Sequence, residues 1–182
     1  MKMLLYCVKG KPYLFKSPEC MDEFNKYYTY NDKKYLEDLV LNGKVVAECD
    51  FEVEWCDTSW YCNDFIEHKG LEKSCLTKEQ LFDYVKGRNE FYAIHIKNLH
   101  IFDEPRELGY YYTRNDDKLK SAPQNMCYCN EWSFDVEKIK ENNGCMIKDY
   151  ILISIKPEHL VNIFNGNKTI EIRKKILNKM KE

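Results

Sequence analysis

Three side chains with complementary charges lie close together near the end of the sequence: Lys168, Glu171 and Arg173. Period-2 alternation along a strand places Glu171 and Arg173 on one face and Ile170 and Ile172 on the other. An ammonium and a bidentate-capable guanidinium suit a phosphate, and a carboxylate accepts from the exocyclic amine of a nucleobase. The simpler interpretation is a surface ion pair between Glu171 and Arg173, worth under about 1 kcal/mol.

The residues just before this group predict the elements that position it. An apolar strand, Ile151–Ile155, leads to Lys156, and a short amphipathic helix and a glycine turn follow. The helix returns the chain, so that Lys156 and Lys168 should bracket one end of the surface that carries the carboxylate and the guanidinium. The sequence therefore predicts that all four side chains converge on one solvent-accessible pocket.

The stretch ILISIKPEHLVNIFNGNKTIEIRKK, residues 151–175, resembles the signature of the ASCH family of PUA-like small β-barrels, strand–KP–helix–G-x-K-x-x-E-x-R. Other segments resemble a longer bacterial and phage subgroup of that family. They are Tyr6–Tyr13, Leu41–Cys49, Lys73–Thr77, Tyr92–Ile96, Ile101–Leu108 and Ala122–Tyr128. The resemblance implies a β-rich α+β fold, a small PUA-like β-barrel with a few short helices.

The order of these segments differs from that of the family, in which the signature opens the domain. The order here suggests a circular permutation, with residues 1–129 as the main part of the barrel and 130–149 as a connector. Residues 150–176 would complete the same barrel as a strand–helix–strand segment, with strand Ile151–Ile155 pairing within the same sheet system as Lys2–Val8, and 177–182 would form a tail. Barrels tolerate such cuts in surface loops. The alternative is a truncated tandem that folds by exchanging segments with a second copy, so the chain is expected to be a monomer or a segment-exchanged homodimer.

Periodicity predicts several further elements. Apolar and acidic residues alternate over Gly43–Trp55, which indicates a strand with a solvated acidic face rather than a cation site. Thr77 and Gln80 form the pattern of a capping box ahead of a helix that stops at Gly87. The other predicted elements are strands Lys2–Val8, Tyr13–Phe15, Phe91–Ile101 and Gln124–Cys129, and a helix near Lys34–Val40.

Charge and cysteine usage narrow the class of protein. The net charge of the 182 residues is −2, which is not the footprint of a protein that coats nucleic acid without specificity. Residues 156–182 nevertheless carry a net charge of +4, so the candidate site lies in the one basic segment. The nine cysteines are scattered and include no C-x-x-C pair, which favours reduced thiols and no metal or other cofactor. No apolar run reaches membrane-spanning length and no export signal is visible, so a cytoplasmic location without membrane contact is expected.

Two functions fit these features. The first is binding of RNA or a nucleotide-like ligand, the usual role of PUA-like barrels, through Lys156, Lys168, Glu171 and Arg173, with Gln124 and Asn125 beside them on the closing strand. The second is hydrolysis, as a ribonuclease or as an amidohydrolase on modified nucleosides, with Lys168 and Glu171 as the candidate catalytic residues. Amidohydrolase members of the family carry a threonine nucleophile where this chain has Glu171, so binding is favoured. Trp55, Trp60 and Trp132 could stack on bases, although core or rim positions are more common for tryptophan.

Overall fold

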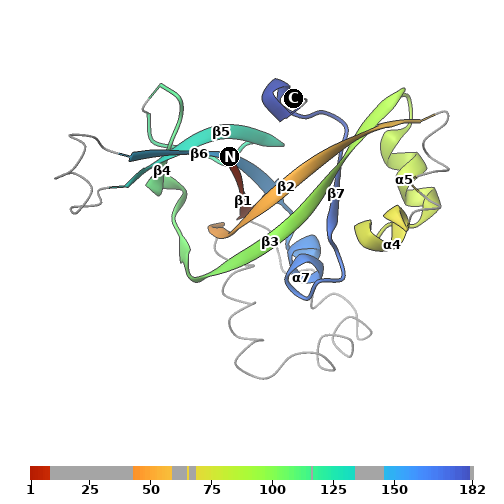
Figure 1. Cartoon of the computed structure of the whole chain (residues 1–182), viewed down its shortest axis with the longest axis horizontal. Helices are drawn as coiled ribbons and strands as arrows, with labels where there is room; N and C mark the ends of the chain where they lie inside the picture. The colour runs from red at the N-terminus through yellow and green to blue at the C-terminus, as the bar shows by residue number, and fades with distance from the viewer. Residues whose placement is uncertain (9–42, 59–64, 66–68, 116, 134–145, 181–182) are drawn as a thin grey trace. The chain divides into compact units, whose positions relative to one another are not determined.

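A computed structural model describes residues 1–8, 43–58, 65, 69–115, 117–133 and 146–180 (Figure 1). Seven strands form one mixed sheet in the order β4-β5-β6-β1-β2-β3-β7. The strands are β1 Lys2–Cys7, β2 Val45–Asp57, β3 Glu90–Arg106, β4 Tyr111–Tyr112, β5 Met126–Ser133, β6 Met146–Ile155 and β7 Ile170–Arg173. The α-helices in this part of the chain are α4 Gly70–Ser74, α5 Lys78–Val85 and α7 Pro157–Phe164, with short 3₁₀ turns at Leu108–Tyr110 and Asn178–Met180.

The β-rich α+β class is confirmed, but the predicted closure of the sheet into a barrel is not seen. The strand order is linear, and across the described residues no ladder joins β4 to β7. The outermost strands, β4 and β7, have only two and four residues, so each offers few backbone groups for a closing ladder. The strand near Tyr13–Phe15 and the helix near Lys34–Val40 lie outside the described residues.

The chain divides into two compact units. The first comprises Met1–Glu48 and His100–Pro157, and the second comprises Cys49–Leu99 and Glu158–Glu182.

The first unit contains the strand pairing that the exchanged segment order predicts. Strand β1 runs parallel to β6, with Lys2 opposite Tyr150 and Cys7 opposite Ile155. The chain start and the strand before Lys156 therefore share one sheet, which confirms the predicted pairing. Strand β5 pairs antiparallel with β6 from Met126 and Ile153 out to Ser133 and Met146, so both strands extend into the range predicted as a connector.

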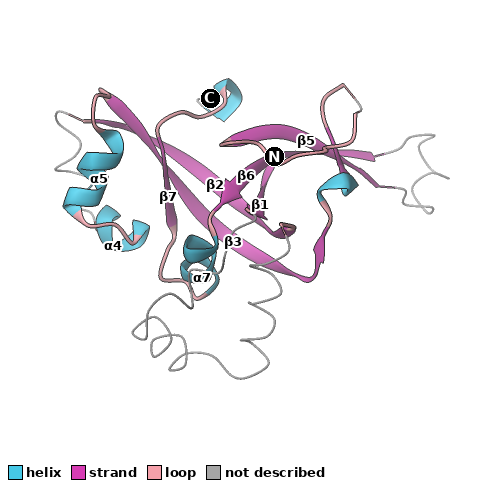
Figure 2. Cartoon of the chain, turned by 180° about the vertical axis from the view of Figure 1, so that it is seen from behind, coloured by secondary structure: helices cyan, strands magenta, loops and turns pink. Residues whose placement is uncertain are grey.

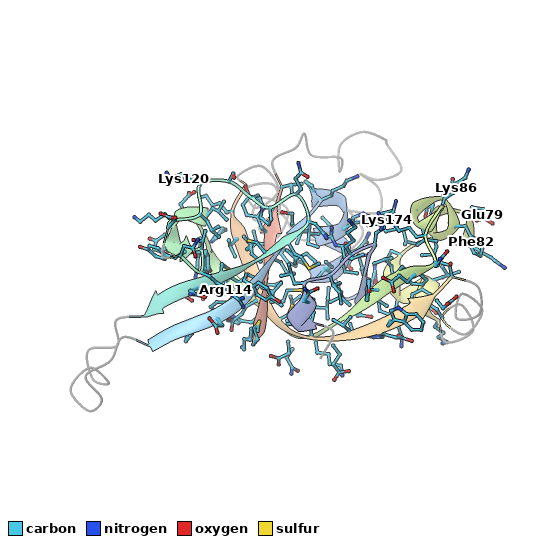
Figure 3. The ribbon with its side chains drawn as sticks, turned by 90° about the horizontal axis from the view of Figure 1, so that it is seen from above. Glu79, Phe82, Lys86, Arg114, Lys120 and Lys174 are labelled. Carbon is cyan, nitrogen blue, oxygen red and sulfur yellow. The ribbon has the colours of Figure 1, made fainter. Side chains whose placement is uncertain are left out.

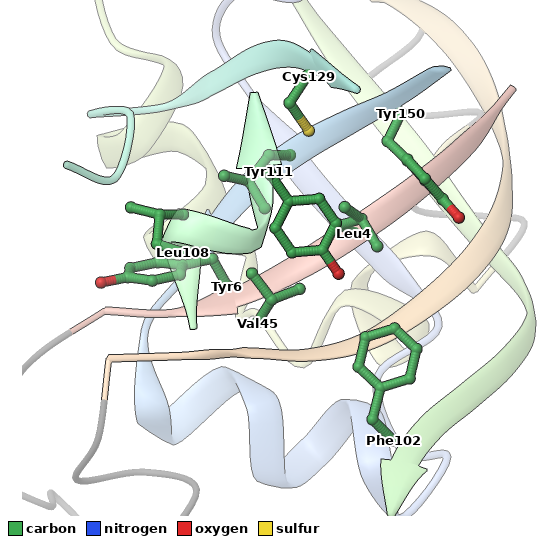
Figure 4. Close-up of a cluster of buried hydrophobic side chains, with 9 residues drawn as sticks. Leu4, Tyr6, Val45, Phe102, Leu108, Tyr111, Cys129 and Tyr150 are labelled. Carbon is green, nitrogen blue, oxygen red and sulfur yellow. The ribbon is translucent and has the colours of Figure 1, made fainter. Parts of the chain in front are cut away.

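Aromatic and aliphatic side chains form the core of the first unit (Figure 4). Leu4 on β1 and Leu152 on β6 are fully buried, and Tyr111 packs edge-on against Tyr150 with ring centroids 6.3 Å apart. Residues 151–155 are buried on both faces of the strand, as expected for a central strand of a mixed sheet that reads as a continuous apolar run.

A polar network borders this core. The guanidinium of Arg106 donates to Glu131 Oε1 at 3.0 Å and to the Tyr111 hydroxyl at 3.4 Å, and the Tyr150 hydroxyl donates to Glu131 Oε2 at 3.1 Å. Burial raises the pKa of Tyr111 to about 12, although the hydrogen bond from Arg106 acts in the opposite direction. Burial, with the nearby charge of Glu131, also raises the pKa of Tyr150. The network joins β3, β4, β5 and β6 through buried phenols that the fold keeps protonated.

The second unit has its own core behind β7. Ile170 and Ile172 pack with Phe91 and Ala93 of β3 and with apolar residues of α5, which confirms the apolar face predicted for β7. Helix α5 begins with the predicted capping box, in which the backbone N–H of Gln80 donates to Thr77 Oγ1 and the Gln80 side chain accepts from the Thr77 N–H. Helices α4 and α5 follow each other in this unit (Figure 2).

The acidic face of β2 is paired with β3 in the second unit. Asp50 accepts from the Asn98 amide at 2.8 Å, Glu52 lies 2.5 Å from the Lys97 ammonium, and Glu54 lies 2.9 Å from His95 Nε2. Glu52 and Glu54 are exposed, as predicted for a solvated face. The carboxylates are thus spread along a strand, each with its own partner, and they do not converge.

The raised pKa of Tyr111 predicts a pH-dependent loss of stability. A phenol with a folded-state pKa of about 12, against about 10 when unfolded, binds more protons in the folded state. The contribution of the protonated Tyr111 to the free energy of unfolding is fully present below pH 10. It is lost as the pH rises toward 12, and roughly 1 kcal/mol of it is lost by pH 11. Urea unfolding of Tyr111→Phe should therefore show a flatter decline between pH 9 and pH 11 than the parent. Tyr110→Phe, at an exposed neighbouring phenol, should decline like the parent; identical slopes for all three proteins would contradict the prediction.

Candidate functional site

Helix α7 and the turn after it place Lys168 at the start of β7. Gly166 adopts φ +78°, the left-handed conformation predicted just past the helix end, and the Asn167 N–H donates to Asn165 Oδ1 at 3.0 Å. The Lys168 N–H then donates to the carbonyl of Asn162 in the last turn of the helix at 2.8 Å. These bonds return the chain tightly, so the register of β7 is set by the helix that precedes it.

The three charged side chains of the predicted site are in contact. The Lys168 ammonium lies 3.3 Å from Glu171 Oε2, and Arg173 Nη2 lies 3.0 Å from Glu171 Oε1. The carboxylate is therefore held between two cations, one at each oxygen. We call Lys168, Glu171 and Arg173 the ionic cluster.

The ionic cluster is largely withdrawn from water. The exposed fractions of the side chains are 3% for Lys168, 9% for Glu171 and 13% for Arg173. Exposed ion pairs contribute little, whereas buried charges cost several kcal/mol each to desolvate and depend on their partners. The simpler interpretation of a solvated Glu171–Arg173 surface pair is therefore wrong. Arg173 is the most exposed of the three, so it is the member that a ligand in solvent would reach first.

Lys168 also completes the end of helix α4. Its ammonium donates to the carbonyl of Ser74 at 2.7 Å, and the Thr169 N–H donates to the carbonyl of Lys73 at 2.8 Å. The last carbonyls of a helix have no partner within the helix, and a cation near them also interacts favourably with the helix dipole. The same ammonium thus connects α4 to the carboxylate of Glu171.

The neighbours of the ionic cluster across the ladder are apolar or aromatic. In the antiparallel pairing of β3 with β7, Glu171 lies opposite Ile94 and Arg173 lies opposite Tyr92. Directly opposed residues project from the same face of a sheet. Ile94 is fully buried, so a carboxylate sits beside an aliphatic side chain, and its two cations offset that placement.

The other predicted site residues belong to the first unit. Lys156 is exposed and directly follows β6. Gln124 is exposed, and the carbonyl of Asn125 accepts from the Ser154 N–H at 3.1 Å. The closing strand lies alongside β6, which brings Asn125 near the end of the strand that precedes Lys156. The membership of these three residues in one site with the ionic cluster stays a prediction.

Some groups that lie beside the ionic cluster could not be recognised from side-chain chemistry in the sequence. The carbonyl of Ser74 is a backbone group, and only the resemblance of Lys73–Thr77 to a family segment pointed to that region. The exposed Cys75 comes next, with φ 55°. Burial of its thiol raises the pKa of Cys75, and the Lys168 ammonium opposes that shift. The cysteine is thus a neighbour of the cluster and is not activated by it.

Two further features concern metal-ligating side chains and the length and apolarity of the helices. In the described ranges, no three or more His, Cys, Asp or Glu side chains are grouped so as to hold a metal ion. Within the same ranges, no helix has the length and apolarity needed to cross a membrane.

The protein is a β-rich α+β protein with one seven-stranded mixed sheet and a largely buried Lys–Glu–Arg group on the edge strand β7. Compared with protein-family models, curated proteins and solved structures, the chain matches none of them.

The contacts of Lys168 predict its effect on stability. Lys168→Met removes the donor to the Ser74 carbonyl and leaves Glu171 with one cation fewer, so urea unfolding should show a loss of about 3 to 5 kcal/mol. Adding Glu171→Gln should recover part of this loss, because the carboxylate that lacks its cation is then neutral. Lys175→Met, at an exposed position, should change stability by less than about 0.5 kcal/mol. A Lys168→Met protein as stable as the parent would show that the ammonium contributes nothing to the fold.

Proposed function

We propose that this protein binds RNA or a nucleotide-like ligand through the ionic cluster. The observation that carries the proposal is the charge of the cluster: two cations share one carboxylate, which leaves a formal excess of one positive charge among three mostly buried side chains. A largely buried positive charge is favourable when an anion can approach it, and the phosphate of a nucleotide supplies that anion.

Each member of the cluster has a distinct part in this proposal. Arg173 presents a planar guanidinium whose Nη2 contacts Glu171 Oε1, and the fork geometry of a guanidinium matches phosphate oxygens. Lys168, which is almost fully buried, adds positive charge at the other oxygen of Glu171. Glu171 holds the two cations in place, with one carboxylate oxygen toward each.

The family resemblance and the segment order lead to a proposal about the family of this chain. We propose that the chain is a permuted relative of the ASCH domain. The parallel pairing of β1 with β6 supports the permuted segment order, because it joins the two exchanged segments in one sheet. The alternative, a chain that completes itself by exchanging segments with a second copy, predicts a dimer of which each half carries one ionic cluster.

Hydrolysis is the competing proposal for the same residues. A general base must accept a proton from water, and both oxygens of Glu171 already face a cation. Abstraction of a proton by this carboxylate would compete with these contacts, so binding is favoured over turnover.

Titration of short single-stranded RNAs and nucleoside monophosphates tests the proposal. Arg173→Ala should weaken binding between about tenfold and a hundredfold, since a hydrogen bond to a charged group is worth about 1.5 to 3 kcal/mol. Arg173→Lys keeps the charge without the planar fork; it guards against misfolding and should fall between Arg173→Ala and the parent. With two cations engaged, the logarithm of the affinity should fall against that of the salt concentration with a slope of about −1.4.

The exposed Lys175→Ala and the tail variant Lys181→Ala are the controls, and both should bind much like the parent. Equal losses in all variants would indicate a diffuse basic tail instead of a site. Turnover of an acylated nucleoside that Lys168→Ala abolishes would favour the hydrolase instead.

A further inference from the structure

An exposed tryptophan lies on the same sheet as the ionic cluster, in the second unit. Trp55, near the end of β2, retains 49% of its surface exposed. Its indole Nε1–H donates to Glu90 Oε2 at 2.7 Å, so one edge of the ring is fixed to the start of β3. Large aromatic side chains are usually buried, and a tryptophan that is anchored by its polar edge and half exposed is typical of a contact surface.

A chain of contacts leads from Trp55 toward Arg173. The other oxygen of the same carboxylate, Glu90 Oε1, accepts from the Tyr92 hydroxyl at 2.8 Å. Tyr92 lies directly opposite Arg173 in the ladder between β3 and β7. Glu90 and Tyr92 are two residues apart on one strand, and their side chains therefore project from the same face. The sheet face that carries Arg173 and Glu171 thus continues through Tyr92 and Glu90 to the indole.

We infer that Trp55 is the base-stacking residue of the nucleotide site, with the phosphate of the ligand at Arg173. This inference rests on the proposed function and adds to it the part of the ligand that gives specificity for a planar heterocycle. Strand β3 alone separates β2 from β7 in the sheet, so these two strands are about 10 Å apart. One nucleotide, or two neighbouring ones in a single strand, can bridge that distance.

The charge pattern of the face fits a nucleotide along this line. The cations lie at the β7 end, where the phosphate would bind, and the aromatic side chain lies at the β2 end. The Glu90 carboxylate between them already accepts one hydrogen bond from Trp55 and one from Tyr92. A rigid aromatic surface binds a base with little loss of side-chain entropy and accepts any base, because every base has a π-face.

Two other exposed aromatic residues of the same unit lie on helix α5 and not on the strands that carry Trp55 and Arg173. Phe82 and Tyr84 are 41% and 38% exposed, and each ring has a lysine over it. Lys78 Nζ is 5.7 Å from the Phe82 ring centroid and Lys174 Nζ is 4.6 Å from that of Tyr84. Phe82 (Figure 3) is similarly exposed but lies on α5, so it serves as the matched control for Trp55.

The test compares adenosine monophosphate with ribose 5-phosphate, which has the same phosphate and sugar without a base. The parent should bind adenosine monophosphate between about fivefold and a hundredfold more tightly, the range expected for stacking of one base. Trp55→Ala should bind the two compounds equally. Trp55→Phe should keep part of the difference, and Phe82→Ala should keep all of it. A pentanucleotide of adenylate that binds more tightly than the monophosphate would identify RNA as the source of the nucleotide.

The outcomes separate this inference from the proposed function. If Arg173→Ala weakens binding while Trp55→Ala leaves the preference for adenosine monophosphate intact, the stacking role is overturned and the site stands. If the parent binds neither the nucleotide nor the pentanucleotide, the proposed function fails and the stacking role fails with it. Melting temperatures of all variants accompany the titrations, and the conservative Trp55→Phe variant still decides the question if Trp55→Ala does not fold.

Discussion

The contact on which the second unit depends most is the carboxylate of Glu171 between the ammonium of Lys168 and the guanidinium of Arg173. The same ammonium binds the Ser74 carbonyl, so the group connects the edge strand to the end of α4. Desolvating three charges is costly, and replacing such a group by apolar residues is often neutral or stabilising. A need for stability alone therefore gives little reason for its presence, whereas a need to hold one excess positive charge in place does.

The organisation around that contact separates scaffold from chemistry. Ile170 and Ile172 pack into the core on one face of β7, and the charged residues occupy the other. Because β7 is an edge strand of only four residues, its position depends on the turn from α7 and on the bond between Thr169 and α4. A site on an edge strand whose start is fixed by two helices can be rigid without a closed barrel.

Sequence patterns that span a few residues were sufficient to predict part of this structure. Alternation identified the two faces of β7, and the capping box at Thr77 identified the start of α5, because both depend on neighbours within a few residues. The pairing of β1 with β6 was predicted from the resemblance and segment order. The open sheet was not predicted, because closure depends on the lengths of edge strands far apart in the chain. The burial of Lys168 could not be predicted either, since its partner is a backbone carbonyl 94 residues away.

If the positive charge of the ionic cluster serves a ligand, a bound nucleotide must place its phosphate there. The decisive measurement is a crystal structure from crystals soaked with adenosine monophosphate. We expect phosphate density within hydrogen-bonding distance of the Arg173 guanidinium, with the contacts of Glu171 to both cations retained. Nucleotide density at a position remote from Arg173, with the ionic cluster unchanged, would contradict the claim and leave the cluster as a purely structural group.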